Sequence, residues 1–164
     1  MAGPEHETTA SRAERRALDL LARRPRAESE LRHALATHGY ADDVIDATLS
    51  RLVARGYVDD RALAVEYLVS RAERLGHAPS RLLAELRTRG VPESVLEAAE
   101  REAREVHGVD APRMVRREID RRGAGPDADP RRKARVYNAL LRAGYDADDV
   151  AAALGVAPPD ESEP

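Results

Sequence analysis

The chain contains no cysteine, tryptophan or phenylalanine, and its aromatic side chains are supplied by five tyrosines. Without cysteine it cannot form a disulfide, a thiolate zinc site or a cysteine nucleophile. No apolar stretch approaches the roughly 20 residues that span a bilayer. Residues 1–10 are polar and lack the apolar segment of a secretory signal peptide. We therefore expect a cytoplasmic protein that does not enter a membrane.

The overall charge offers no global attraction to nucleic acid, because 27 basic and 30 acidic residues leave a net charge of −3. The basic residues are almost all arginine, and Lys133 is the single lysine. GC-rich codons would explain this bias without any function. Only the placement of the arginines along the chain can therefore indicate a function.

Apolar residues recur at helical spacing along the chain, and no segment alternates as a half-buried strand does. Ser11 with Glu14 has the spacing of a capping box, so we expect Ser11 to cap the first helix. Glycines and prolines punctuate the periodic segments. The pattern predicts helices at about residues 11–24, 28–38, 41–55, 59–75, 80–89, 92–107, 111–122, 130–143 and 146–154.

The apolar stripes of these helices should form the core. Near helix ends the predicted stripes include His38, Val53 and Val106, and Val115 with Ile119 should face inward further along. The tyrosines must supply most of the large packing volume, so we expect them to anchor the core or adjoining units. They are Tyr40, Tyr57, Tyr67, Tyr137 and Tyr145.

Three segments share one layout of two apolar residues four apart, followed four residues later by a glycine. They are Leu31-x3-Leu35-x3-Gly39, Leu82-x3-Leu86-x3-Gly90 and Val136-x3-Leu140-x3-Gly144. Each glycine is followed by a valine, which is Val44, Val95 or Val150 in turn. Gly144 and Val150 are separated by one residue more than the other two pairs, so we expect one extra residue in the third segment. A period near fifty residues is typical of a tandem helical array. We predict an all-α fold of three three-helix repeats, elongated and curved.

The expected organisation has two disordered tails and three repeats. The tails are residues 1–10 and the acidic residues 156–164, whose composition disfavours a packed core. The repeats should cover residues 11–57, 58–108 and 109–155.

Neither a duplex-reading helix nor an enzyme is favoured by the motifs. A helix-turn-helix reads DNA with its second helix, and here the second helix of each pair begins with acidic residues, which would repel phosphates. These residues are Asp42, Asp43, Glu93, Asp148 and Asp149. No zinc spacing, phosphate loop or nucleophile motif is present, so we expect no cofactor, no metal and no catalysis.

Residues 111–135 are locally basic, with nine basic and four acidic side chains, a balance of +5. A solvated helix face laced with ion pairs would also account for them. We nevertheless take these side chains as candidate contacts to a partner or to DNA, and we add Tyr67 and Arg71. The basic candidates are Arg113, Arg116, Arg117, Arg121, Arg122, Arg131, Arg132, Lys133 and Arg135.

Four phrases in order, spanning about residues 12–154, resemble the RecX family, whose members regulate the RecA recombinase. They are residues 20–31 (LLARRPRAESEL), 56–71 (GYVDDRALAVEYLVSR), 76–86 (GHAPSRLLAEL) with the following Gly90-Val91-Pro92, and 140–145 (LLRAGY). The chain departs from the family pattern at Leu63, where an aromatic residue is usual.

The resemblance implies a non-enzymatic regulator that binds RecA or its nucleoprotein filament on DNA. It further implies suppression of RecA ATP hydrolysis and strand exchange, and a place in homologous recombination, DNA repair and the SOS response. An alternative is a helical array that binds DNA independently of RecA. We expect a monomer with at most weak direct DNA binding.

Overall fold

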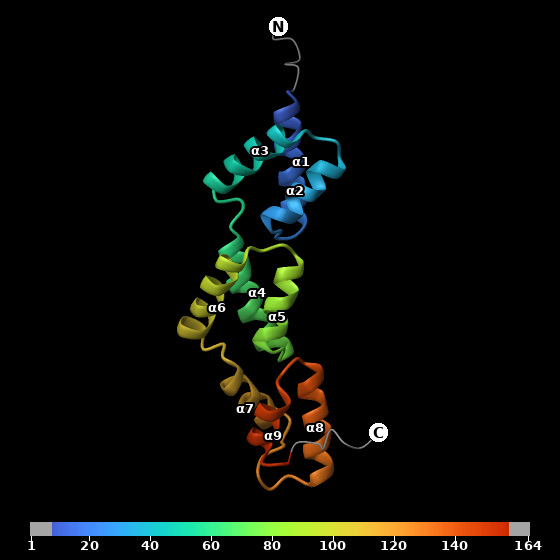
Figure 1. Ribbon diagram of the computed structural model, residues 1–164, viewed down its shortest axis with the longest axis vertical. Coiled ribbons are helices and arrows are strands. Elements are labelled where there is room, and N and C mark those ends of the chain that lie inside the picture. The colour runs from blue at the N-terminus through green and yellow to red at the C-terminus, as the bar shows by residue number, and fades with distance from the viewer. Residues whose placement is uncertain (1–7, 158–164) are drawn as a thin grey trace. The chain divides into compact units, whose positions relative to one another are not determined.

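The computed structural model describes residues 8–157, which form nine α-helices and contain no strand (Figure 1). The helices are α1 (Thr9–Arg23), α2 (Glu28–Thr37), α3 (Asp42–Ala54), α4 (Asp60–Leu75), α5 (Pro79–Thr88), α6 (Glu93–His107), α7 (Ala111–Arg121), α8 (Pro130–Arg142) and α9 (Ala147–Leu154). The predicted all-α class is confirmed. Of the disordered tails predicted at residues 1–10 and 156–164, residues 1–7 and 158–164 lie outside the described residues, whereas Thr9 and Ala10 belong to α1, against expectation.

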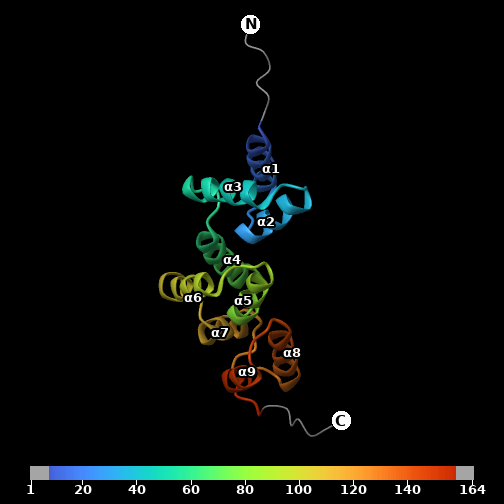
Figure 2. The same ribbon diagram turned by 45° about the horizontal axis from the view of Figure 1, so that its top comes forward.

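The chain divides into two compact units. The first comprises Met1–Ala64 with Leu86–Leu96, and the second comprises Val65–Glu85 with Glu97–Pro164. Both views show α1, α2 and α3 grouped together, and α7, α8 and α9 grouped together (Figures 1 and 2). Each unit is described by itself below.

The first unit has one apolar cluster at its centre, to which α1, α2 and α3 all contribute. Burying a leucine or isoleucine side chain in such a cluster contributes roughly 1.5–3 kcal/mol to folding. Leu18, Leu21, Ala34 and Tyr40 pack against its edge. The buried members are Ala17, Leu20, Leu31, Leu35, Ile45, Leu49, Leu52 and Val58.

Several details near helix ends in the first unit differ from the sequence-based expectation. Thr8 caps α1 in place of Ser11, because the Thr8 side chain accepts a hydrogen bond from the Ser11 N–H. His38 follows the last residue of α2, is exposed, and its ring bonds the Ala34 carbonyl oxygen at 2.9 Å. The predictions for α1 and α2 were thus wrong only at the start of α1 and at the end of α2.

Val53 and Tyr57 are exposed by 46% and 52%, although both were predicted to be buried. Their neighbours Leu52 and Val58 fill the core instead. The Tyr57 ring lies beneath the guanidinium of Arg55, with 5.5 Å from its central carbon to the ring centroid. An aromatic ring covered by a cation can stay at the surface at little cost.

In the second unit α7, α8 and α9 contact one another and bury their apolar faces. Val115 and Ile119 are buried as predicted, whereas Val106 on α6 is 71% exposed, against expectation. Val106 lies in the last turn of α6. The buried face of this helix includes Ala99 and Ala103 and does not extend to Val106. The buried side chains of the last three helices are Met114, Val115, Glu118, Ile119, Val136, Tyr137, Leu140, Val150, Ala151 and Leu154.

The three repeat glycines end α2, α5 and α8 in the same turn, which we call the repeat turn. In each, the N–H after the glycine bonds the carbonyl five residues back, as Tyr40 does to Leu35 at 3.3 Å and Tyr145 to Leu140 at 3.2 Å. This is a Schellman motif, and it needs a positive φ at the glycine. The φ angles are 82° at Gly39, 79° at Gly90 and 94° at Gly144.

The third repeat carries no extra residue after its glycine, so that prediction was wrong. α9 begins three residues after Gly144, just as α3 begins three residues after Gly39. Val150 is fully buried and stands six residues after its glycine, where Ile45 and Leu96 are buried in the earlier repeats. Val150 therefore corresponds to Ile45 and Leu96, and not to Val44 and Val95, which stand one position earlier.

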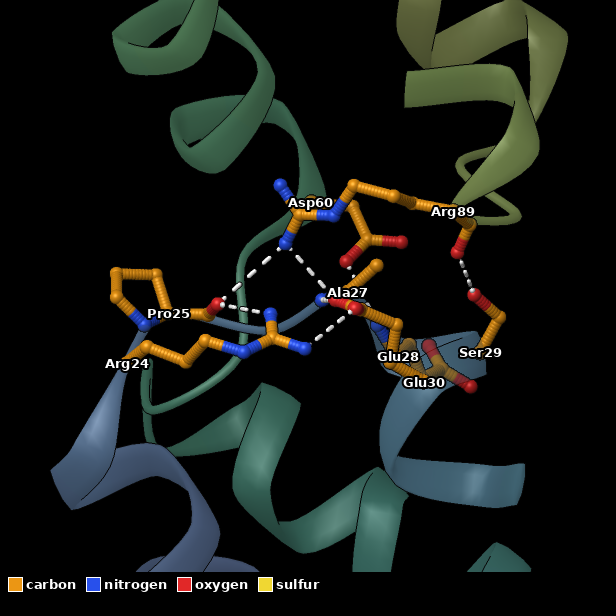
Figure 3. A network of polar contacts seen from close by, with 8 residues as sticks. All are labelled: Arg24, Pro25, Ala27, Glu28, Ser29, Glu30, Asp60 and Arg89. Atoms are coloured by element: carbon orange, nitrogen blue, oxygen red, sulfur yellow. Dashed lines mark hydrogen bonds and ion pairs between the residues drawn. The ribbon is translucent and has the colours of Figure 1, made fainter. Parts of the chain in front are cut away.

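In the first unit the start of α2 is fastened by the carboxylate of Glu30 (Figure 3). Glu30 accepts hydrogen bonds from the Ala27 N–H at 2.9 Å and from Arg24 at 2.9 Å. Arg89, which follows α5, donates a third at 2.8 Å. Burial raises the pKa of Glu30, but the hydrogen bonds from Arg89, Arg24 and Ala27 together lower it to about 2.

Two further hydrogen bonds fasten the start of α2, one to Arg89 and one to the start of α4. The Ser29 hydroxyl donates to the Arg89 carbonyl oxygen at 2.7 Å, and Asp60 at the start of α4 accepts from the Glu28 N–H at 2.8 Å. The contacts of Ser29 and Glu30 with Arg89 and the repeat turn at Gly90 are called the first docking contact below. They fasten the start of α2 to a part of the chain beyond α3 (Figure 3).

The second unit contains a corresponding contact, called the second docking contact. Ser80 stands two residues before Leu82, as Ser29 stands two before Leu31. Donors from the start of α5 here bond carbonyl oxygens of the repeat turn after α8. The pairs are Ala78 N–H to Ala143 at 3.0 Å, Ser80 hydroxyl to Gly144 at 3.2 Å and Arg81 to Arg142 at 2.8 Å.

Close approach at these contacts leaves no room for a side chain at the glycine. A Cβ at Gly90 would lie 2.5 Å from the Ser29 hydroxyl oxygen, and one at Gly144 would lie 2.7 Å from the Cβ of Arg81. A Cβ at Gly39 would meet no atom of the described chain within 4 Å. The repeat turns of Gly90 and Gly144 are thus each packed against another helix start, while the turn at Gly39 is open.

Candidate partner-binding surface

The basic candidates all lie on α7, on the loop that follows it and on α8, within the second unit. Asp110 and Asp129 cap these helices by accepting the N–H of Arg113 and of Arg131. A proline in the first turn follows each cap, which suits a helix start because its missing N–H is not needed there. The caps fix the two helices whose arginines were predicted to form a binding face.

Arg121 and Arg122 do not point freely into solvent, because both bond the carboxylate of Glu118. The distances are 2.7 Å from Arg121 and 3.2 Å from Arg122, and the Glu118 side chain is only 1% exposed. A buried carboxylate needs such partners, since an unpaired buried charge is strongly unfavourable. These two arginines therefore have a structural role that the sequence analysis did not assign to them.

Glu118 also touches other elements of the second unit. A Cβ at Gly76, in the turn between α4 and α5, would lie 2.5 Å from the Glu118 carboxyl carbon. The Tyr145 hydroxyl is buried without a hydrogen-bond partner among the described residues, and burial together with the charge of Glu118 raises its pKa to about 12. Tyr145 is thus a core anchor, as predicted. The Glu118 side chain on α7 lies against the turn between α4 and α5 at Gly76.

The remaining basic candidates are available to a partner. Arg113 is 73% exposed and lies 3.9 Å from Asp110, a distant pair. Within residues 8–157, the Arg116 side chain bonds only the Pro112 carbonyl oxygen of its own helix, at 3.4 Å. In the described part of the chain no ion pair engages the side chains of Arg116, Arg117, Arg131, Arg132, Lys133 or Arg135.

Tyr67 and Arg71 belong to a separate polar group formed by α4 and α5. The Arg71 guanidinium lies over the Tyr67 ring, 4.5 Å from its centroid, and the Tyr67 hydroxyl donates to Glu85 at 2.6 Å. Arg81 donates to the other Glu85 oxygen at 3.0 Å. The Tyr67 hydrogen bond, opposed by burial and aided by Arg81, lowers the pKa of Glu85. Both candidate side chains are half-buried, so only part of each is accessible to a partner.

His77 lies in the turn before α5, close to this group. Burial lowers the pKa of His77, and the charges of Arg81 and Arg71 add to that effect against the opposing charge of Glu85. The protonated form of His77 is therefore less favoured than that of a free imidazole.

Comparison with known proteins identifies the family. Family models match the first three-helix domain of RecX over residues 13–52 and the second three-helix domain of RecX over residues 59–99. The chain is 39% identical over 145 residues to regulatory protein RecX of Halorhodospira halophila, covering 88% of each chain. It is 36% identical over 135 residues to regulatory protein RecX of Mycobacterium avium, covering 78% of this chain and 74% of that one.

Solved structures share the fold. The crystal structure of RecX from Lactobacillus salivarius superposes with a TM-score of 0.67 at 16% identity, covering 89% of this chain and 94% of that one. A further crystal structure, of a regulatory protein RecX, gives 0.61 at 22% identity, covering 85% and 68%. Among the described residues no helix combines the length and apolar character needed to cross a membrane. The sequence relationship over most of its length shows that this chain belongs to the RecX family of regulatory proteins.

Proposed function

We propose that this protein binds the RecA recombinase, or its filament on DNA, and lowers its ATP hydrolysis and strand exchange. Family membership carries the proposal, because the relatives that match over most of the chain are regulatory proteins. On this proposal the protein acts as a cytoplasmic monomer in homologous recombination, DNA repair and the SOS response. It does so by occupying a surface of its partner and not by catalysis.

The second unit supplies the surface that supports this function. Six cationic side chains on α7 and α8 are free of ion pairs in the described part of the chain, so they keep their charge available for an acidic protein surface or for phosphates. Such charges accelerate encounter and fix orientation more than they raise affinity. The ion pairs of Glu118 with Arg121 and Arg122 support the C-terminal end of α7, the helix that carries Arg116 and Arg117.

The direct test titrates the protein into the DNA-dependent ATPase assay of RecA from the same organism. We expect hydrolysis to fall as the protein approaches a stoichiometric ratio to the filament binding sites. Unchanged hydrolysis at stoichiometric concentration, with both proteins folded by circular dichroism, would reject the proposal.

A four-residue variant tests the surface separately. Replacing Arg116, Arg117, Arg131 and Arg132 by alanine removes only side chains without ion pairs, so folding should be preserved. We expect a higher protein concentration to be needed for half-maximal inhibition. The matched control replaces Arg12, Arg23, Arg101 and Arg104, which are exposed arginines on α1 and α6, and should inhibit like the parent.

The same variants separate the alternative of RecA-independent DNA binding. If DNA binding were the primary activity, the parent would bind duplex or single-stranded DNA tightly without RecA, and the four-residue variant would lose that binding. Loss of DNA affinity with RecA inhibition intact would show that the two activities use different surfaces. Equal inhibition by the variant and its control would mean that RecA is contacted elsewhere on the chain.

A further inference from the structure

A hollow of about 430 Å³ in the second unit is lined by residues of α7, of the loop after it, of α8 and of α9. Its volume lies in the range of roughly 300–1,000 Å³ that is typical of small-molecule sites. Its apolar wall includes Ile119, Ala124 and Leu154, and two cationic side chains, Arg116 and Lys133, line it from different helices. An apolar hollow with a few polar groups from separate elements has the composition of a ligand site.

Lys133 differs from the other half-buried cations of the second unit. In the part of this unit that the structure describes, four cationic side chains are half-buried, and three of them have a partner. The three are Arg71 over the Tyr67 ring, Arg81 beside Glu85 and Arg122 beside Glu118. Lys133, the fourth and the single lysine of the chain, has no hydrogen bond or ion pair to another described residue.

Arg116, the second cation of the hollow, also lacks a carboxylate partner among the described residues. Arg116 and Lys133 line neighbouring hollows too, but this one is lined by both. A half-buried cation such as Lys133 is unfavourable unless an anion pairs with it. The hollow thus presents two cations whose ion pairs a bound anion would complete.

The same hollow offers hydrogen-bond acceptors. Asp120 lines it, and no hydrogen bond or ion pair engages the Asp120 side chain within residues 8–157. Ala153 and Leu154 line it as well, and as the last residues of α9 their carbonyl groups lack the partner that a continuing helix would supply. A ligand that fills this hollow therefore needs N–H or O–H donors in addition to its negative charge.

Two cations match the charge of a phosphate monoester. Such a group carries about 1.5 to 2 negative charges near pH 7, whereas an internal phosphodiester carries a single charge. Arginine can bind phosphate through two N–H groups, and lysine contributes a compact charge. A nucleoside adds what the rest of the wall requires, because its amino and hydroxyl groups are donors and its flat ring suits the apolar side.

We propose that this hollow binds a nucleoside phosphate through its terminal phosphate group, with Arg116 and Lys133 as the phosphate-binding residues. The ligand is either a free nucleotide or the phosphorylated end of a DNA strand, which present the same chemistry. Such a site goes beyond the regulation of RecA, and the protein alone is sufficient to test it.

The single lysine makes the site directly measurable. An amine-acylating reagent modifies Lys133 and the α-amino group of the full-length protein, and mass spectrometry of its peptides reports the rate at each. We expect adenosine monophosphate at millimolar concentration to slow the acylation of Lys133 several-fold and to leave that of the α-amino group unchanged. Adenosine without phosphate, and inorganic phosphate without a nucleoside, should protect Lys133 much less.

Arg116→Gln removes one of the two phosphate-binding residues and leaves Lys133 available to the reagent. We expect the concentration of adenosine monophosphate that halves the acylation rate to rise roughly tenfold, because a hydrogen bond between charged groups is lost. The matched control Arg104→Gln alters an exposed arginine of α6 and should be protected like the parent. Circular dichroism verifies that the variants are folded.

A short oligodeoxyadenylate, with and without a terminal phosphate, distinguishes the two sources of the ligand. The comparison is made at about 0.15 M salt, where distant charges are screened. Protection by the phosphorylated strand and not by its unphosphorylated form would support recognition of a strand end. Protection by the mononucleotide and by neither strand would support a free nucleotide.

Four outcomes would overturn the proposal. Inorganic phosphate that protects as well as the nucleotide would show that the hollow takes any anion, and an unphosphorylated strand that protects as well as the phosphorylated one would show a general attraction of charge. An oligoglutamate peptide that matches the nucleotide would make an acidic protein segment the ligand. Finally, Lys133 might be acylated at the same rate with every nucleotide and strand, or be protected equally in the parent and in Arg116→Gln.

Discussion

Three donors converge on the carboxylate of Glu30, and they make this residue a pH-sensitive element of the first unit. Because its pKa is lowered from 4.5 to about 2, its stabilisation is complete above pH 4.5 and is lost as the pH falls toward 2. The side chain is 17% exposed, so the full shift corresponds to at most about 3 kcal/mol.

We expect Glu30→Gln to lower the free energy of unfolding at pH 7 by about 2 kcal/mol, because the charged pair with Arg89 is removed. It should also flatten the dependence of stability on pH between 4.5 and 2. Urea unfolding followed by circular dichroism across this range measures both effects. Glu93→Gln is the control, since the Arg87–Glu93 pair is exposed on both sides and its removal should barely move the midpoint. Parallel pH profiles of parent and Glu30→Gln would contradict the assignment.

Arginines that look alike in sequence differ in their consequences for folding. We expect replacing Arg121 and Arg122 together by alanine to destabilise the protein by about 3 kcal/mol, because buried Glu118 is left without either cationic partner. Replacing Arg116 and Arg117 should change stability by less than about 0.5 kcal/mol. Chemical denaturation of the two double variants compares them directly. Similar destabilisation by both pairs would show that the clamp on Glu118 contributes little.

At the scale of elements, the three repeat turns share a backbone but differ in what they touch. Gly39→Ala should cost about 1 kcal/mol, from the positive φ alone. Gly144→Ala should cost more than this, since its Cβ would also collide with that of Arg81. Thermal unfolding of the two variants tests the difference, and Gly90→Ala should resemble Gly144→Ala. A Gly39→Ala variant as unstable as the other two would contradict the role of the docking contacts.

The helices and their turns were predictable because their signals are local. Apolar residues three and four apart mark a buried face, and the repeat glycines follow at a fixed distance. The errors fell at helix ends, where periodicity does not say which side the last turn presents: Val53, Val106 and His38 continue the stripe on paper but are exposed. Likewise, Val150 was aligned by residue type, whereas burial aligns it with Ile45 and Leu96.

The candidate surface was predictable only in part. Its location on α7 and α8 follows from composition, and the spacing of Glu118 to Arg121 and Arg122 is visible as i, i+3 and i, i+4. That Glu118 is buried, and therefore engages these arginines as its ion-pair partners, depends on packing that no local pattern reports. The Glu30–Arg89 pair joins residues 59 apart, a separation at which sequence alone gives no signal.

At the scale of the whole molecule, a net charge of −3 coexists with a cluster of available cations. We expect weak binding to single-stranded DNA whose affinity falls steeply with salt, because bound phosphates release counterions. In the four-residue variant without Arg116, Arg117, Arg131 and Arg132, the logarithmic salt slope should shrink by about 0.7 for each phosphate that is no longer neutralised. Fluorescence anisotropy at several salt concentrations measures the slopes. Binding that is insensitive to salt in the parent would contradict a role for these charges.

The two docking contacts, although alike in backbone geometry, are made of different chemistry. One depends on an ionised carboxylate, whereas its counterpart uses peptide oxygens and a guanidinium that never titrates. Acidification toward pH 2 therefore weakens the first docking contact by removing the charge of Glu30, while the Ser29–Arg89 hydrogen bond and the second docking contact contain no group that titrates there. A change of pH alone thus weakens one docking contact relative to the other, without any substitution.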